Sequence, residues 1–231
     1  MALKWGICST GKICSDFCSA LKTLPSENHQ IVAVVSRSQD TAEKFATTFD
    51  IPKTYSSYEK FAADPEIEIV YIGSAHTEHV RRNTSSLWRR YGVAVSHCII
   101  ESKKNYFQEH RRRSDGLACL VYGEDPVSIK AVGEVAESGH DIDGCVILSY
   151  SKGQKACLMY SSKVNSATNC ASINGTNGSI EIKDYFWCPE EVELKTGKET
   201  NAIPVGPVPF NYPNSGGLCY EAEEVRKCIK S

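Results

Sequence analysis

Over the first 80 residues, short apolar runs alternate with stretches in which apolar residues recur three or four positions apart. The continuous runs, typical of strands buried on both faces, are Leu3 to Cys8, Ile31 to Val35 and Ile67 to Gly73. The helical spacing appears at Ile13, Phe17, Leu21 and Leu24, and again at Ala42, Phe45, Ala46 and Phe49. We expect Ser38 to Asp40 to cap the second helix, and Ser56 to Glu59 to form a capping box for a short third one. This alternation predicts an α/β fold with a parallel, doubly wound sheet.

Beyond residue 120 the pattern is that of strands joined by tight turns. Asn177-Gly178 is a two-residue hairpin signal, and two further pairs of runs flank short polar connections. These pairs are Cys145 to Tyr150 with Lys155 to Tyr160, and Glu191 to Lys195 with Glu199 to Ile203. We therefore expect a C-terminal α+β domain over 120–231, with a largely antiparallel, open-faced sheet and a closing helix from Tyr220 to Ile229.

Composition narrows the range of functions. The charge is nearly balanced, with 26 Lys and Arg against 28 Asp and Glu, so electrostatics favour neither nucleic acid nor an acidic membrane as a partner. No apolar run reaches the roughly 20 residues that a membrane span needs, and residues 1–7 do not resemble a secretion signal. Eleven cysteines without a CxxC pair favour reduced thiols in the cytoplasm over a disulfide framework or a metal site.

The turn after the first predicted strand is a candidate dinucleotide site. It comprises Ser9, Thr10, Gly11, Lys12 and Ile13, followed by Cys14. A dinucleotide needs a tight turn, close approach of the backbone to its pyrophosphate and a helix N-terminus aimed at the charge. Of the usual G-x-G-x-x-G/A pattern only the middle glycine is kept, with small residues in the outer positions. The place of this turn between a strand and a helix favours a dinucleotide site over a plain glycine turn.

The end of the second predicted strand bears on which dinucleotide is bound. NAD enzymes place Asp or Glu there for the ribose hydroxyls, whereas this chain has Ser36-Arg37. A guanidinium binds a 2′-phosphate bidentately, so we expect NADP; the alternative is a solvated surface arginine. His76 and His79 follow the third strand, but two histidines three apart in a loop, without further ligands, do not indicate a metal.

Segments near both ends of the chain resemble the Gfo/Idh/MocA oxidoreductase family. They are MALKWGICSTGKICSDF, VAVVSRS and IPKTYSSYEKFAADPEIEIVYIGSAHTEH, and later NGTNGSIEI, WCPEEVELK and LCYEAEEVRKCI. The resemblance implies NADP-dependent oxidation of trans-dihydrodiols of aromatics, or of aldoses such as D-xylose, by a cytoplasmic homodimer paired through its C-terminal sheet. By position it assigns the pyrophosphate to Ser9 to Ile13 and the 2′-phosphate to Arg37. It also places Tyr71, His76 and His79 beside the cofactor and Tyr212 beside the substrate pocket.

The middle of the chain departs from this family. The resemblance implies a Glu-Lys-Pro lysine and a later tyrosine as catalytic groups, yet no Glu-Lys-Pro occurs, and the catalytic residues stay unassigned. Residues 80–118 instead hold seven of the nine arginines. Three explanations are open: translation from a shifted reading frame, which we favour, a surface loop, or a basic patch for nucleic acid.

These observations predict three parts and leave two functions open. A truncated Rossmann half, 1–79, precedes an arginine-rich segment, 80–119, and the C-terminal sheet domain, 120–231. The chain is then an NADP-dependent dehydrogenase, or a catalytically inactive NADP-binding or dimerising remnant that lacks the family's catalytic lysine and tyrosine.

Overall fold

The computed structural model describes residues 1–73, 94–96, 117–137, 141–161, 163 and 169–230. The chain divides into two compact units, one made of Met1–Cys98 with Thr200–Ser231 and the other of Ile99–Glu199. Within these described ranges, every helix is too short or too polar to cross a lipid bilayer.

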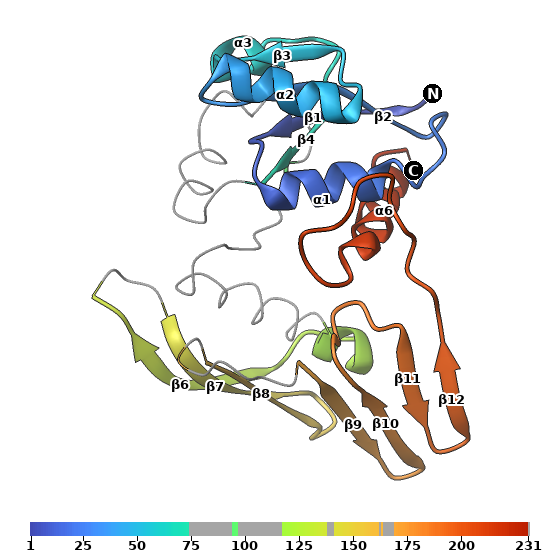
Figure 1. Cartoon of the computed structure of the whole chain (residues 1–231). Helices are drawn as coiled ribbons and strands as arrows, with labels where there is room; N and C mark the ends of the chain where they lie inside the picture. The colour runs from blue at the N-terminus through green and yellow to red at the C-terminus, as the bar shows by residue number, and fades with distance from the viewer. Residues whose placement is uncertain (74–93, 97–116, 138–140, 162, 164–168, 231) are drawn as a thin grey trace. The chain divides into compact units, whose positions relative to one another are not determined.

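The first unit is built on a five-stranded sheet with the order β3-β2-β1-β4-β5, in which all neighbouring strands are parallel (Figure 1). Its strands are β1 Leu3–Cys8, β2 His29–Val35, β3 Lys53–Tyr55, β4 Ile69–Ile72 and β5 Ala94–Ser96. Its helices are α1 Lys12–Leu21, α2 Gln39–Phe49 and α3 Tyr58–Ala62. The predicted Rossmann-type α/β sheet is confirmed, and one of its strands, β5, comes from the arginine-rich segment.

Helices cover both faces of this sheet. On one face, Phe17 of α1 packs edge-on against Trp5 at 5.1 Å and stacks on Tyr71 at 3.7 Å between ring centroids. On the other, Phe61 of α3 lies against Gly6. Because successive strand residues point to opposite faces, Trp5 and Gly6 place α1 and α3 on opposite sides of the sheet, which is the doubly wound arrangement.

Local details of this unit differ from the sequence prediction. The cap of α3 is Ser57 rather than Ser56: its Oγ accepts from the backbone N–H of Lys60 at 3.2 Å and donates to Glu59 Oε2 at 2.7 Å. That hydrogen bond lowers the pKa of Glu59. Ser38 does precede α2, but its side chain forms no capping hydrogen bond. The strand β3 was not predicted, because three half-buried residues are too few to show a period.

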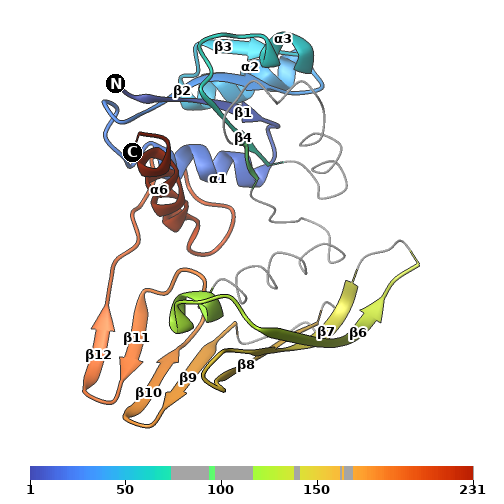
Figure 2. The ribbon, with the colours of Figure 1, turned by 180° about the vertical axis from the view of Figure 1, so that it is seen from behind.

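The second unit contains two antiparallel sheets (Figure 2). The three-stranded one has the order β6-β7-β8, with β6 Ser128–Val135, β7 Asp141–Ser149 and β8 Lys155–Ser161. The four-stranded one has the order β12-β11-β10-β9, with β9 Ala171–Gly175, β10 Gly178–Ile182, β11 Glu191–Leu194 and β12 Gly197–Thr200. The predicted antiparallel pairing in the C-terminal part is thus confirmed, but in two sheets and not one; β12 begins before the expected Glu199, and β6 was not predicted.

A helical stretch covers part of one face of the β6-β7-β8 sheet. Residues 117–122 are helical, and the ring of Tyr122 lies 4.2 Å from that of Tyr150. The Tyr122 hydroxyl donates to the carbonyl of Lys155 at 2.9 Å. Val146 and Leu148 of β7 complete this small core, so it is apolar packing that holds the helical residues on the sheet.

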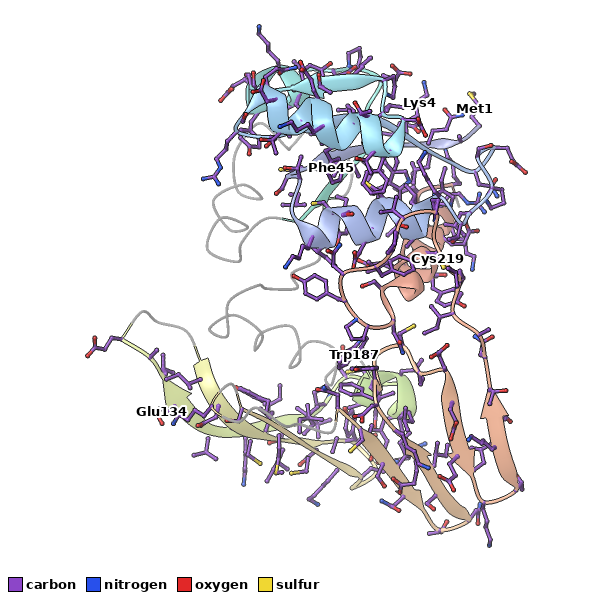
Figure 3. All side chains as sticks on the ribbon, viewed as in Figure 1. Met1, Lys4, Phe45, Glu134, Trp187 and Cys219 are labelled. Atoms are coloured by element: carbon purple, nitrogen blue, oxygen red, sulfur yellow. The ribbon has the colours of Figure 1, made fainter. Side chains whose placement is uncertain are left out.

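The C-terminal helix α6, Leu218–Lys230, packs against α1. It follows a 3-10 turn, η2 Ser215–Gly217, and Cys219 in its first turn is buried (Figure 3). The strand pattern predicts this helix within a 120–231 domain, whereas the structure joins Thr200–Ser231 to the parallel-sheet unit. The reason is a set of long-range contacts that no local pattern reveals.

One of these contacts is a chain of two hydrogen bonds through the buried side chain of His29. Trp5 Nε1 donates to His29 Nδ1 at 3.2 Å, and His29 Nε2 lies 2.9 Å from Glu223 Oε2 on α6. Because an indole only donates, His29 Nδ1 must be the acceptor, which places the proton of a neutral ring on Nε2, facing Glu223. Hydrogen bonds from Arg226 and His29 lower the pKa of Glu223 to about 2. These hydrogen bonds connect α6 to β1 and β2.

Candidate cofactor-binding site

The turn after β1 has the tight geometry that a dinucleotide site needs. Ser9 has a φ of 100°, and its backbone N–H donates to the carbonyl of Val35 at 2.9 Å. A positive φ is the conformation that glycine adopts readily and serine rarely does. Ser9 occupies the first glycine position of the dinucleotide pattern, and it makes the same turn despite its side chain.

Gly11 leaves the N-terminus of α1 open. Its φ is −73°, and an added Cβ would meet Gly73 O at 3.7 Å and Ser9 Oγ at 3.9 Å, both ordinary contacts. Nothing in the described fold therefore requires glycine here, whereas close approach of a ligand to the backbone does. No side chain caps α1, its first turn holds no acidic residue, and Lys12 is exposed beside it. The residues present therefore fit a pyrophosphate at this helix end.

Cys14 and Gly73 form the floor beneath the turn. The thiol of Cys14 lies 3.8 Å from the carbonyl oxygen of Cys8 and 3.7 Å from that of Gly73, and the Gly73 N–H donates to the Cys8 carbonyl at 3.2 Å. Burial raises the pKa of the Cys14 thiol well above its usual range, so it stays protonated and is not a nucleophile. A Cβ on Gly73 would lie 2.4 Å from the Cys14 sulfur. The missing side chain at Gly73 thus compensates for cysteine in the third small-residue position of the pattern.

The end of β2 lies beside the turn. Thr10 Oγ1 and Ser36 Oγ are 3.4 Å apart, and the Ser36 N–H donates to the carbonyl of Tyr55 at 3.0 Å. Arg37 comes next and is exposed; among the described residues, no acid pairs with its guanidinium. The structure therefore brings Ser9, Thr10 and Gly11 together with Arg37 at the carboxyl edge of the sheet, where a parallel sheet binds its ligand.

The other predicted cofactor residues are placed differently. The side chain of Ile13 is buried beside Gly73, so only its backbone can face a ligand. Tyr71 is fully buried, with its ring stacked on Phe17 at an interplanar angle of 7°, and its side chain lies in the core and not at the edge. His76 and His79 lie outside the described residues. In the part of the chain that the structure does describe, no group of three or more His, Cys, Asp or Glu could hold a metal ion.

Tyr212 lies on an irregular segment that packs along α1. Its backbone N–H donates to Asp16 Oδ2 at 3.0 Å, and the side chain of Asn211 donates to the carbonyl of Lys12 at 3.4 Å. The predicted substrate residue is therefore attached to the helix that begins at the dinucleotide turn. Asp16 was missed by the sequence analysis, although a carboxylate one position before the inward-facing Phe17 was a detectable signal.

Comparisons with known proteins agree with this architecture. Residues 3–110 match the family described as an oxidoreductase family with an NAD-binding Rossmann fold, GFO_IDH_MocA. The trans-1,2-dihydrobenzene-1,2-diol dehydrogenase of Sus scrofa is 31% identical, with 100% of this chain and 89% of that protein covered. The enzyme of the same name from Danio rerio is 32% identical, with 99% and 89% covered.

Solved structures share the fold at low sequence identity. An oxidoreductase from Agrobacterium radiobacter, in complex with NAD+, L-tartaric acid and magnesium, has a TM-score of 0.68 at 11% identity, covering 100% of this chain and 89% of that one. An aldose-aldose oxidoreductase from Caulobacter crescentus has a TM-score of 0.66 at 13% identity, covering 99% and 90%.

The alignment with the Sus scrofa enzyme also locates a difference in length. It spans 299 positions, whereas this chain has 231 residues, so at least 68 positions of the relative have no counterpart here. Both ends of the chain match, which places the missing positions inside it. The family model, the relatives and the fold agree on one assignment: the chain belongs to the Gfo/Idh/MocA family of oxidoreductases.

Proposed function

We propose that the chain binds NADP, with the pyrophosphate at Ser9 to Ile13 and the 2′-phosphate at Arg37. The observation that carries this proposal is the exposed guanidinium of Arg37 at the end of β2, beside the phosphate turn and where NAD-specific sites have an acid. The backbone of the first α1 turn binds the diphosphate, and the hydroxyls of Ser9 and Thr10 add donors at the same edge. When bound, the nicotinamide supplies the hydride acceptor for an alcohol.

Titration of nucleotide fluorescence tests this proposal. We expect NADPH to bind more tightly than NADH, and Arg37→Ala to weaken NADPH binding about tenfold to a hundredfold, the value of hydrogen bonds to a charged group. NADH binding should stay unchanged. Lys44→Ala removes another exposed cation, on the neighbouring α2, and is the matched control for general electrostatics. Equal affinity of the wild type for both nucleotides would refute NADP selection, and so would an Arg37→Ala variant whose NADPH affinity equals that of the wild type.

We further propose trans-dihydrodiols of aromatics, or aldoses such as D-xylose, as substrates. The names of the relatives support the first class, and the aromatic side chain of Tyr212, half-buried beside α1, suits an aromatic or sugar ring. Reduction of NADP with a dihydrodiol and with D-xylose separates the two classes. The free thiols of the described cysteines agree with a cytoplasmic location.

Pairing of two copies through the C-terminal sheet is part of the same proposal. On the β6-β7-β8 sheet, Val132 stands opposite Cys145 and Cys145 opposite Met159, so the three side chains share one face. Val132 is 76% and Met159 79% exposed in the single chain. Apolar side chains gathered on one open face indicate an association surface. Sedimentation equilibrium should give twice the 25.5 kDa of one chain; a single-chain mass contradicts this.

A second candidate function is a nucleotide-binding remnant without turnover. It is favoured by the 68 or more positions of the relative that this chain lacks, and by the absence of a Glu-Lys-Pro motif in its sequence. Hydride transfer needs a near-attack geometry, and the alcohol proton needs an acceptor. NADPH binding without measurable diol or xylose oxidation would support this candidate, whereas turnover at an ordinary enzymatic rate excludes it.

A further inference from the structure

Asp16, on the second turn of α1, is a buried carboxylate held by hydrogen bonds from two consecutive residues. It is 0% exposed. Its Oδ1 accepts from the backbone N–H of Asn211 at 2.8 Å and from Asn211 Nδ2 at 2.7 Å, and its Oδ2 accepts from the backbone N–H of Tyr212 at 3.0 Å. Among the described residues, no Lys or Arg forms an ion pair with it. The charge of Asp16 is therefore satisfied by this one segment.

Such a contact restricts the segment more than apolar packing does. A carboxylate removed from water is costly unless hydrogen bonds replace its hydration, and here three N–H groups do so in fixed directions. If the segment moved away, Asp16 would lose all three of these hydrogen bonds. One arrangement of Asn211 and Tyr212 is therefore strongly favoured over all others.

The segment also has a direction along α1. Val208 exchanges hydrogen bonds with Ser19, at the far end of the helix, and Asn211 bonds both Asp16 and the Lys12 carbonyl. Residues 12, 16 and 19 share one helix face. Chain numbers thus rise from 208 to 211 as the segment approaches the N-terminus of α1. The next residue, Tyr212, is held at Asp16, one turn from the N-terminus of α1.

We propose that Asp16 is a positioning residue: it holds Tyr212 beside the first turn of α1, against the part of the dinucleotide next to the pyrophosphate. This inference rests on the proposed NADP binding and extends it, since one helix then holds the coenzyme at its N-terminus and orients an aromatic residue toward it. A purely architectural anchor would need neither the carboxylate nor its position one turn from the binding site.

Acrylamide quenching of bound NADPH fluorescence tests the proposal, because it reports how well the protein shields the nicotinamide. Asp16→Ala and Tyr212→Ala should each raise the quenching constant toward that of free NADPH, and the double variant should raise it no further. Asp16→Asn, which keeps one accepting oxygen, should be intermediate. Asn211→Ala removes the side-chain hydrogen bonds of Asn211, keeps both backbone N–H donors to Asp16, and should follow Asp16→Asn.

Ser19→Ala is the matched control, since it cuts bonds between the same helix and segment at the end away from the turn. It should keep the quenching constant of the wild type. If it exposes the nicotinamide as much as Asp16→Ala does, or if Asp16→Ala and Tyr212→Ala act additively, the specific role of Asp16 is wrong and only a general anchor is left.

Amide hydrogen exchange separates failure of this inference from failure of the proposed function. Asp16→Ala should speed exchange at the amides of Asn211 and Tyr212 by at least about tenfold, the factor expected for loss of a charge-assisted hydrogen bond. Unchanged exchange overturns the positioning role whether or not a nucleotide binds. A wild type that binds no NADPH overturns the proposed function, and the role of Asp16 with it.

Discussion

Gly73 directly follows β4, beneath the dinucleotide turn, and replacing it with alanine should disturb both stability and the site. The added Cβ would lie 2.4 Å from Cys14 Sγ, 3.0 Å from Ile13 Cγ2 and 3.3 Å from Tyr71 Cε1. The backbone of Gly73 is outside the left-handed region, so the effect of Gly73→Ala is steric. Either Cys14 Sγ or the first turn of α1 must shift to relieve so short a contact.

The magnitude follows from packing. Overfilling a well-packed core by one methyl group costs about 1–3 kcal/mol, and we expect Gly73→Ala to reach the upper half of this range. Cys14→Ala alone removes a buried sulfur and should cost about 1–2 kcal/mol. In the double variant the new methyl group occupies space that the sulfur has left, so its loss should be under about 1 kcal/mol. The coupling between the two positions is then about 2–5 kcal/mol, at or above the roughly 0.5–3 kcal/mol that contacting residues usually show.

Urea unfolding of the wild type, both single variants and the double variant measures this cycle, with NADPH titration on the same samples. Nucleotide affinity should fall in Gly73→Ala and recover in the double variant, because the first turn of α1 returns to its place. Gly6→Ala is not a suitable control, since it has its own close contact with Phe61. Free energies of unfolding that simply add across the cycle would show that Cys14 and Gly73 do not share one space.

Two further predictions concern the turn and the C-terminal helix. Ser9→Gly should raise the free energy of unfolding by about 1 kcal/mol, because relief of the positive φ outweighs the added chain entropy; urea melts that show a loss contradict this. Glu223→Gln should destabilise the chain by about 1–2 kcal/mol above pH 5, allowing for the 26% exposure of the Glu223 side chain. Since the folded pKa is lowered to about 2 from 4.5, this stabilisation is lost as pH falls from 4.5 toward 2. Across that pH interval, the free energies of unfolding of the wild type and of Glu223→Gln should converge. A difference that stays constant would refute the stabilising role of the Glu223 carboxylate.

The sequence by itself determined the elements in which burial repeats locally. The predicted run Leu3 to Cys8 is β1 as observed, and the helical spacing that begins at Ile13 is α1, although the helix ends at Leu21 and not at the predicted Leu24. The hairpin predicted at Asn177-Gly178 is found between β9 and β10, but its two connecting residues are Thr176 and Asn177, since Gly178 already pairs with Gly175. The candidate dinucleotide turn and Arg37 could be predicted from local sequence as well, since each follows a strand whose end is visible in the sequence.

Elements without a burial period left no such trace. All eight residues of β6 are exposed in the chain, so neither face imposed an alternation on its sequence. The strand β3 consists of only Lys53, Thr54 and Tyr55, all half-buried, so it has neither the length nor the contrast in burial that a sequence pattern needs. Ser56 and Ser57 are equally good caps by composition, and only the path of the backbone selects Ser57.

Only the tertiary structure decided which distant residues complete the site. Asp16 binds residues 195 and 196 positions away, and His29 meets Glu223 across 194 positions. Gly73 accommodates Cys14 across 59 positions. Local patterns record how a residue faces the core, whereas the partner it meets there depends on how the helices pack on the sheet, and that packing is a property of the whole unit.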